Sequence, residues 1–238
     1  MTGQPDLPDT QMESLRGAYV YETPVRLWHW INALSVVVLS ITGYLIGVPL
    51  PTTTGDASEW YVMGWMRFFH YVSAYVFTIG LIVRVWWAAV GNRYARQMFY
   101  LPIWRRSWVS ELLYQLRWML FAERRSMLYL GHNPLANAMM FTLFLIPSVI
   151  VTITGFAMYA EASGHESWQY AAFAWFIDLW VNTQDLHTIH RLAMWVIVLF
   201  AIAHIYTAVR EDIMSGQSMI STMVNGERLF KGRGVIKR

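Results

Sequence analysis

Long apolar stretches separated by shorter polar segments dominate the pattern of this 238-residue chain. A helix needs about 20 mostly apolar residues to cross a hydrocarbon core roughly 30 Å thick. Four stretches of the chain meet this requirement. We predict four membrane-spanning helices, at residues 25–48, 60–90, 134–160 and 186–209.

Local signals set the ends of these helices. Pro49 ends the first, because proline cannot continue a helix. Asn133 followed by Pro134 is typical of a helix start, with a capping side chain and then a proline in the first turn. In the second span, Arg67 and Arg84 enclose only 16 uncharged residues. We therefore expect both arginines to extend toward the bilayer surfaces and lengthen the span.

Two further segments are expected to lie on the membrane surface. Residues 100–121 mix tryptophan and leucine with arginine, which is typical of an amphipathic helix lying at the interface. Residues 168–180 are aromatic but too short to cross, and we place them at the outer interface. The predicted organisation is an N-terminal tail (1–20), a four-helix membrane domain (21–212) and a C-terminal tail (213–238).

The charges between the spans orient the bundle. The segment 92–133 contains seven arginines and two acidic residues, and the chain from Arg210 onward contains six lysines or arginines. The other two loops, 49–59 and 161–185, contain no lysine or arginine and six acidic residues. Because basic residues collect on the cytoplasmic side, we predict a multi-pass protein with both termini in the cytoplasm.

Composition supports this class and narrows the chemistry. Hydrophobic residues make up 56% of the chain and charged residues 14%, against about 25% charged in an average soluble domain. A soluble globule and a disordered chain are therefore excluded. The chain contains no cysteine, which excludes disulfides, thiolate metal sites and iron–sulfur clusters. The net charge of +3 is explained by the cytoplasmic loops, so we predict no nucleic-acid partner.

Histidines carry the candidate chemistry, because ionisable groups inside a membrane are costly and mark functional sites. His190 and His204 lie 14 residues apart on the fourth span. At 100° per residue they differ by roughly 40° from four full turns, so both project from one face, about 21 Å apart along the axis. Helix direction gives the depths of the others. His29 falls at the inner level with His204, and His70 at the outer level with His190.

Two imidazoles at one depth on different helices are the axial ligands that a six-coordinate haem b requires. We therefore predict an all-α membrane protein, a four-transmembrane-helix bundle that binds two b-type haems. Small residues that would let a flat ring approach the helices are Gly43, Gly80 and Gly155. Arginines that could neutralise haem propionates are Arg67 and Arg191 at the outer level and Arg26 at the inner level.

His187 leaves one assignment open. It lies three residues before His190, so it could replace His190 as the outer ligand, or the pair could bind a transition metal. A metal site would also favour carboxylates, and Asp185 is the only one nearby. A single histidine in a span is otherwise most often a hydrogen-bonding partner between helices, and the matched depths of four histidines argue against that reading here.

Five segments of the chain form a distinctive set: 21–30 (YETPVRLWHW), 91–94 (GNRY), 131–134 (GHNP), 187–192 (HTIHRL) and 210–215 (REDIMS). Together they closely resemble the cytochrome b subunit of membrane-bound uptake nickel–iron hydrogenases, a family related to the gamma subunit of respiratory formate dehydrogenase. The resemblance covers nearly the whole chain. It implies haem ligands on the first, second and fourth helices, at His29, His70, His190 and His204, which agrees with the pairing by depth.

The resemblance also implies function, partners and location. The partners are a small iron–sulfur subunit anchored in the membrane, a large nickel–iron subunit facing the periplasm, and a quinone in the lipid bilayer. The chain would then be an electron-transfer subunit of a hydrogen:quinone oxidoreductase in a bacterial inner membrane. It would not activate hydrogen itself, because it lacks the cysteines that hold a nickel–iron centre.

Two other functions remain open at this stage. The chain could be the di-haem membrane subunit of another respiratory enzyme, such as formate dehydrogenase. It could instead be a histidine-lined transporter without haem. The absence of an internal repeat or an interrupted pair of helices argues against the transporter.

Overall fold

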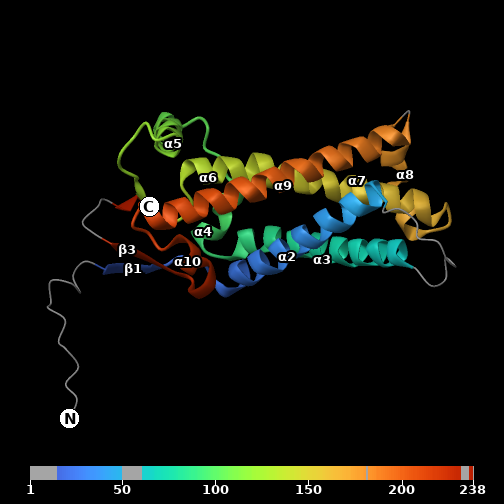
Figure 1. Ribbon diagram of the computed structural model, residues 1–238, viewed down its shortest axis with the longest axis horizontal. Helices are drawn as coiled ribbons and strands as arrows, with labels where there is room; N and C mark the ends of the chain where they lie inside the picture. Colours follow the sequence, from blue (N-terminus) through green and yellow to red (C-terminus); the bar gives the residue numbers. More distant parts are fainter. Residues whose placement is uncertain (1–14, 50–60, 181, 232–235, 238) are drawn as a thin grey trace, which may run out of the picture. The chain divides into compact units, whose positions relative to one another are not determined.

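A computed structural model of the protein describes residues 15–49, 61–180, 182–231 and 236–237. Most of these residues are helical (Figure 1). Some sequence predictions concern residues outside this set, and the structure says nothing about them. They include the first 14 residues of the N-terminal tail, the acidic loop residues Asp56 and Glu59, position 60 of the second span, position 181 of the loop 161–185, and residues 232–235 and 238 of the C-terminal tail.

The structure contains four long apolar helices, one in the region of each predicted span. They are α2 (Thr23–Gly47), α3 (Val62–Val90), the compound helix Pro134–Ser163 and α9 (Thr183–Met214). Each is long and apolar enough to cross a membrane. Helix α9 continues without a break past both His190 and His204.

The third long helix contains a local irregularity. It begins as α6 (Pro134–Met139), widens into a π-helical turn η2 (Met140–Leu145) and continues as α7 (Ile146–Ser163). The side chain of Asn133 caps its start by accepting a hydrogen bond from the backbone N–H of Ala136 at 2.7 Å. Pro147 has no N–H to donate to the preceding turn, and the wider turn directly precedes it.

The chain divides into two compact units. The first, here called the membrane-helix unit, consists of Trp28–Trp86 and Thr142–Phe200. It holds most of α2, α3, α7 and α9, together with the short helix α8 (Trp168–Ile177). Helix α8 packs against α7, and the two lie side by side in Figure 1. Ser167 caps α8 by accepting a hydrogen bond from the N–H of Tyr170.

Arg84 differs from the sequence prediction. Its side chain is only 3% exposed, whereas we expected it to extend toward the bilayer surface. The guanidinium lies over the ring of Trp28, 5.4 Å from its centroid. The electron-rich face of an indole attracts a cation most strongly where water is excluded. Arg84 is therefore held inside the membrane-helix unit.

The second, here called the terminal unit, consists of the described residues within Met1–Leu27, Trp87–Phe141 and Ala201–Arg238. Strand β1 (Leu15–Tyr19) pairs antiparallel with β3 (Glu227–Lys231), with Gly17 opposite Leu229. Figure 1 shows these two strands side by side. A short parallel pair joins β2 (Leu128–Tyr129) and β4 (Ile236–Lys237). The buried core beside the longer pair contains Val20, Tyr21, Val25, Tyr94, Ala95, Leu130 and Phe230.

Short helices complete the terminal unit. They are α4 (Arg93–Arg96), the 3-10 turn η1 (Gln97–Phe99), α5 (Arg106–Met119) and α10 (Met219–Asn225). Helix α5 lies inside the segment 100–121 that we predicted to be amphipathic. Its last carbonyl groups, those of Trp118 and Met119, accept hydrogen bonds from the Arg210 guanidinium. A cation at this end also complements the helix dipole.

Candidate functional site

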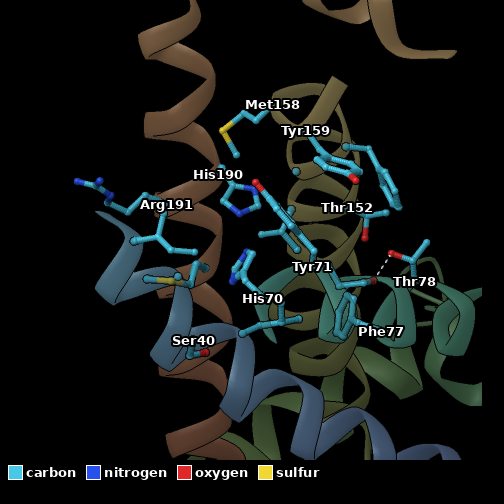
Figure 2. Close-up of a pocket in the computed structure, with 18 of the residues that line it drawn as sticks. Ser40, His70, Tyr71, Phe77, Thr78, Thr152, Met158, Tyr159, His190 and Arg191 are labelled. Atoms are coloured by element: carbon cyan, nitrogen blue, oxygen red, sulfur yellow. Dashed lines mark hydrogen bonds between the residues drawn. The ribbon is translucent and has the colours of Figure 1, made fainter. Parts of the chain in front are cut away.

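A cavity of about 470 Å³ lies inside the membrane-helix unit, lined by residues of α2, α3, α7 and α9. Small-molecule and cofactor sites typically measure about 300–1,000 Å³ and are mostly apolar with a few polar groups. His70 of α3 and His190 of α9 both line it. Figure 2 shows their imidazole rings pointing toward one another. The structure therefore brings together the two histidines that the sequence placed at the outer level.

A threonine hydroxyl contacts each of these imidazoles. The Oγ1 atom of Thr42 on α2 lies 2.9 Å from Nδ1 of His70. The Oγ1 atom of Thr154 on α7 lies 2.8 Å from Nδ1 of His190. Both threonines are buried. Each imidazole is therefore held at Nδ1 by a neighbouring helix, which leaves Nε2 as the ring nitrogen available to a ligand.

A glycine follows each of these threonines and makes room for the imidazole. A Cβ atom at Gly43 would lie 3.2 Å from Cε1 of His70, and one at Gly155 would lie 3.2 Å from Cε1 of His190. These distances are shorter than a comfortable contact between carbon atoms. The two ring positions therefore favour glycine on the facing helix, because a larger residue would push the imidazole away by a few tenths of an ångström. Gly80 differs, because its Cβ would meet Trp28 at an ordinary distance of 3.6 Å.

Two of the predicted arginines are at the same cavity. Arg67 of α3 and Arg191 of α9 both line it, and both side chains are exposed. The Arg191 guanidinium lies against Gly47 of α2, where a Cβ atom would approach it to 2.7 Å. Guanidinium groups placed at the edge of an apolar cavity are suited to pairing with carboxylates of a bound molecule.

Aromatic side chains form another part of the cavity wall. Tyr71 of α3 packs on Tyr159 of α7, with ring centroids 4.7 Å apart. Tyr75 of α3 packs edge-to-face on Phe156 of α7 at 5.4 Å. All four line the cavity. Such a wall offers flat apolar surface to a large conjugated ring.

His187 also lines the cavity, but it is exposed, whereas His190 is half-buried. Within the described part of the chain, no hydroxyl holds the His187 ring in the way that Thr154 holds His190. The geometry therefore favours His190 as the ligand-bearing histidine of α9. The described residues also contain no cluster of three or more histidine, cysteine or acidic side chains that could hold a metal ion.

The inner-level residues fall in different units. His29 of α2 belongs to the membrane-helix unit, and His204 of α9 belongs to the terminal unit; both are half-buried. Their pairing stays a prediction. Arg26 lies in the terminal unit, where its guanidinium donates to Oγ1 of Thr23 at 3.0 Å and to the backbone carbonyl of Val224.

Sequence reasoning missed Thr42 and Thr154. The signal that marks them is a repeated tetrapeptide pattern, isoleucine, threonine, glycine and an aromatic residue, at 41–44 and 153–156. The pattern acquires meaning only when α2 is known to pack beside His70 and α7 beside His190. The two glycines within it were among the three predicted to admit a flat ring.

The fold and this cavity define a class: a mostly helical, multi-pass membrane protein whose long helices form a histidine-lined, cofactor-sized space. More specifically, the chain belongs to the prokaryotic cytochrome b561 family, whose family model matches residues 20–226. Membership implies a b-type haem.

Relatives of known name agree with this assignment. The chain is 51% identical over 218 residues to the probable Ni/Fe-hydrogenase B-type cytochrome subunit of Rhizobium leguminosarum bv. viciae, covering 92% of this chain and 91% of that protein. It is 52% identical over 213 residues to the protein of the same name from Azotobacter vinelandii, covering 90% and 89%. It is 49% identical over 220 residues to the probable Ni/Fe-hydrogenase 1 B-type cytochrome subunit of Escherichia coli K12, covering 90% and 91%. The resemblance drawn from the sequence motifs is confirmed.

The cavity residues fit a b-type haem. Two imidazoles turned toward a shared space can supply both axial nitrogens. The glycines at 43 and 155 keep these rings close to the facing helices. The aromatic wall and the two arginines match the apolar ring and the carboxylate edge of a porphyrin.

Proposed function

We propose that this chain is the di-haem cytochrome b subunit of a membrane-bound nickel–iron hydrogenase, and that it passes electrons from the hydrogenase to the membrane quinone pool. The names of the relatives support the hydrogenase partner. The alignments with these relatives cover about nine-tenths of both chains at about 50% identity. The observation that carries the electron-transfer role is the cavity lined by His70 and His190.

In this proposal His70 and His190 hold the outer haem through their Nε2 atoms, and Arg67 and Arg191 pair with its propionates. A haem b with two imidazole ligands exchanges single electrons and leaves no open coordination position for substrates. The protein residues fix ring orientation, exclude water and neutralise charge. Burial inside the helices keeps the exchanging centre in a low-dielectric setting.

The inner haem is assigned to His29 and His204. The support is helical spacing: His190 and His204 share one face of the unbroken helix α9. Helix α2 carries His29 one turn after the arginine that opens its apolar stretch. Arg26, which we predicted as an inner propionate partner, already donates to Thr23 and Val224, and it would have to share its remaining donors.

The loop charges orient the protein in the membrane and so determine the direction of electron transfer across it. The arginine-rich segments lie on the cytoplasmic side and the acidic loops on the outer side. The small iron–sulfur subunit then docks at the outer face of a bacterial inner membrane, nearest the His70 and His190 level, and the large nickel–iron subunit lies beyond it in the periplasm. Electrons move inward toward quinone. Reduction of quinone near the inner face with cytoplasmic protons would make hydrogen oxidation electrogenic.

A liposome experiment tests this function. The complex purified with its hydrogenase subunits is reconstituted with a quinone, and hydrogen is added while haem absorbance and membrane potential are recorded. We expect hydrogen to reduce both haem components and quinone to reoxidise them. The membrane potential should be negative on the side opposite the hydrogenase. A haem-free preparation, or haems that hydrogen does not reduce, would contradict the electron route. Turnover without a potential would contradict the electrogenic step alone.

A further inference from the structure

We propose that Thr42 and Thr154 are positioning residues that fix the outer-haem imidazoles as their Nδ1–H tautomers and thereby tune the haem potential. This inference rests on the proposed haem site at His70 and His190. It adds two residues that contact neither iron nor porphyrin in the proposal, yet determine how both ligands bind.

The hydrogen-bond pattern at His70 determines the direction of donation. The Thr42 hydroxyl donates its only hydrogen to the backbone carbonyl of Val38, four residues earlier in α2, at 2.7 Å. Its oxygen, 2.9 Å from Nδ1 of His70, is then left to accept. A hydroxyl oxygen that has already donated its hydrogen can only accept, so Nδ1 of His70 carries the proton.

The same arrangement recurs at His190. The Thr154 hydroxyl donates to the carbonyl of Ile150 at 2.6 Å, and its oxygen lies 2.8 Å from Nδ1 of His190. Thr154 is 1% exposed, so water does not compete for its oxygen. Two helices, α2 and α7, thus present one acceptor geometry to two different histidines.

This geometry has a chemical consequence. A neutral imidazole carries one proton, and a proton held at Nδ1 leaves the Nε2 lone pair free for a metal. Partners of the remote N–H also fix ring orientation and raise the basicity of the ligating nitrogen. A more basic nitrogen stabilises the ferric over the ferrous state. The threonines should therefore hold the outer-haem midpoint potential lower than it would be with the ring N–H unpaired.

The glycine that follows each threonine helps to position the same imidazole. A side chain at Gly43 or Gly155 would press on Cε1, the atom between the two ring nitrogens. Its absence lets the imidazole approach closely enough for a hydrogen bond of normal length. One turn of helix thus supplies both an acceptor and the space to reach it.

The test compares hydroxyl loss with methyl loss. Thr42→Val and Thr154→Val keep the side-chain shape but remove the acceptor, whereas Thr42→Ser and Thr154→Ser keep the acceptor. The full complex of each variant is titrated redox-potentiometrically, with the electron paramagnetic resonance signals of the ferric haems as a second readout. His70→Ala and His190→Ala identify which component is the outer haem, because each should abolish it.

We expect each valine variant to raise the midpoint potential of the outer component and shift its low-spin g values. A tenfold loss of ferric over ferrous binding corresponds to a rise of about 59 mV for one electron. Haem affinity of the outer site should fall about 10- to 100-fold, as is typical when a partner of a metal-bound histidine is removed. In the serine variants the potential, the g values and the haem affinity should change by only a small fraction of these amounts. The midpoint potential of the inner component should stay unchanged in all four variants.

Ser35→Ala is the matched control. Ser35 is buried on α2 and donates to the carbonyl of Ile31 at 2.9 Å, as Thr42 does to Val38, but among the described residues its hydroxyl contacts no histidine ring. It should leave the outer component unchanged. Valine variants with unaltered potential and g values would overturn the proposal, and so would serine variants as impaired as the valine ones. Retention of both components in His70→Ala or His190→Ala would instead overturn the haem site itself.

Discussion

Replacing His190 with alanine is expected to lower the haem content of the purified chain from two per chain to one, whereas His187→Ala leaves two. His190 is half-buried, turned into the cavity and held at Nδ1 by Thr154. His187 is exposed, and within the described residues no hydroxyl orients its ring. Without the imidazole of His190, the outer site keeps only one of the two axial ligands that a six-coordinate haem requires. Pyridine haemochrome spectra on protein of known concentration give the ratio.

Each variant is the control for the other, because both remove a histidine side chain and the two positions lie one helical turn apart on α9. The opposite result, with haem lost in His187→Ala and kept in His190→Ala, would transfer the outer ligand to His187. Loss of haem in both would indicate that the start of α9, and not a single ligand, had been disturbed. Far-ultraviolet circular dichroism separates these cases, since an intact α9 preserves the helix signal.

Gly43→Ala and Gly155→Ala are expected to weaken the outer haem site, because each adds a methyl group against a ligand imidazole. Each new Cβ would lie 3.2 Å from an imidazole Cε1, and the ring would have to move by a few tenths of an ångström. Overpacking of this kind costs about 1–3 kcal/mol, which corresponds to roughly a five- to 150-fold loss of haem affinity. Haem transfer from the purified variants to an apo-globin acceptor measures this loss.

Gly80→Ala provides the comparison, because it adds the same methyl group to a neighbouring membrane helix. Its Cβ would meet the Trp28 ring at 3.6 Å, an ordinary contact. The outer haem should dissociate from this variant at the rate seen in the unaltered protein. Equal loss from all three glycine variants would show that helix packing in general, and not the imidazole positions, limits haem retention.

The long helices could be predicted from the sequence because a membrane span needs only length, apolar composition and few charges. Arg84 shows where this reasoning fails. A lone arginine in an apolar stretch is expected to reach the interface, but here Trp28 from another helix accepts it over its ring. A hydropathy profile does not show which residue of another helix lies against the arginine. The pairing of β1 with β3 was missed for a related reason, since the two strands are about 200 residues apart and each is only five residues long.

The outer histidine pair could be predicted because depth and helical phase follow from residue counting alone. Thr42 and Thr154 could not, because a threonine in a span usually bonds only to its own helix. Both do form that bond, and their second role appears only once the neighbouring helix is known. The inner pair, His29 and His204, stays a prediction that rests on spacing.

The central claim is that His70 and His190 bind one and the same haem, and the double variant His70→Ala/His190→Ala tests it most directly. Each single variant should retain one haem per chain. If both ligands serve one site, the second substitution removes nothing further, and the double variant also retains one haem per chain with the spectrum of the inner component. A double variant that retains none would place the two histidines at different haems, and one that retains two would show that neither is a haem ligand.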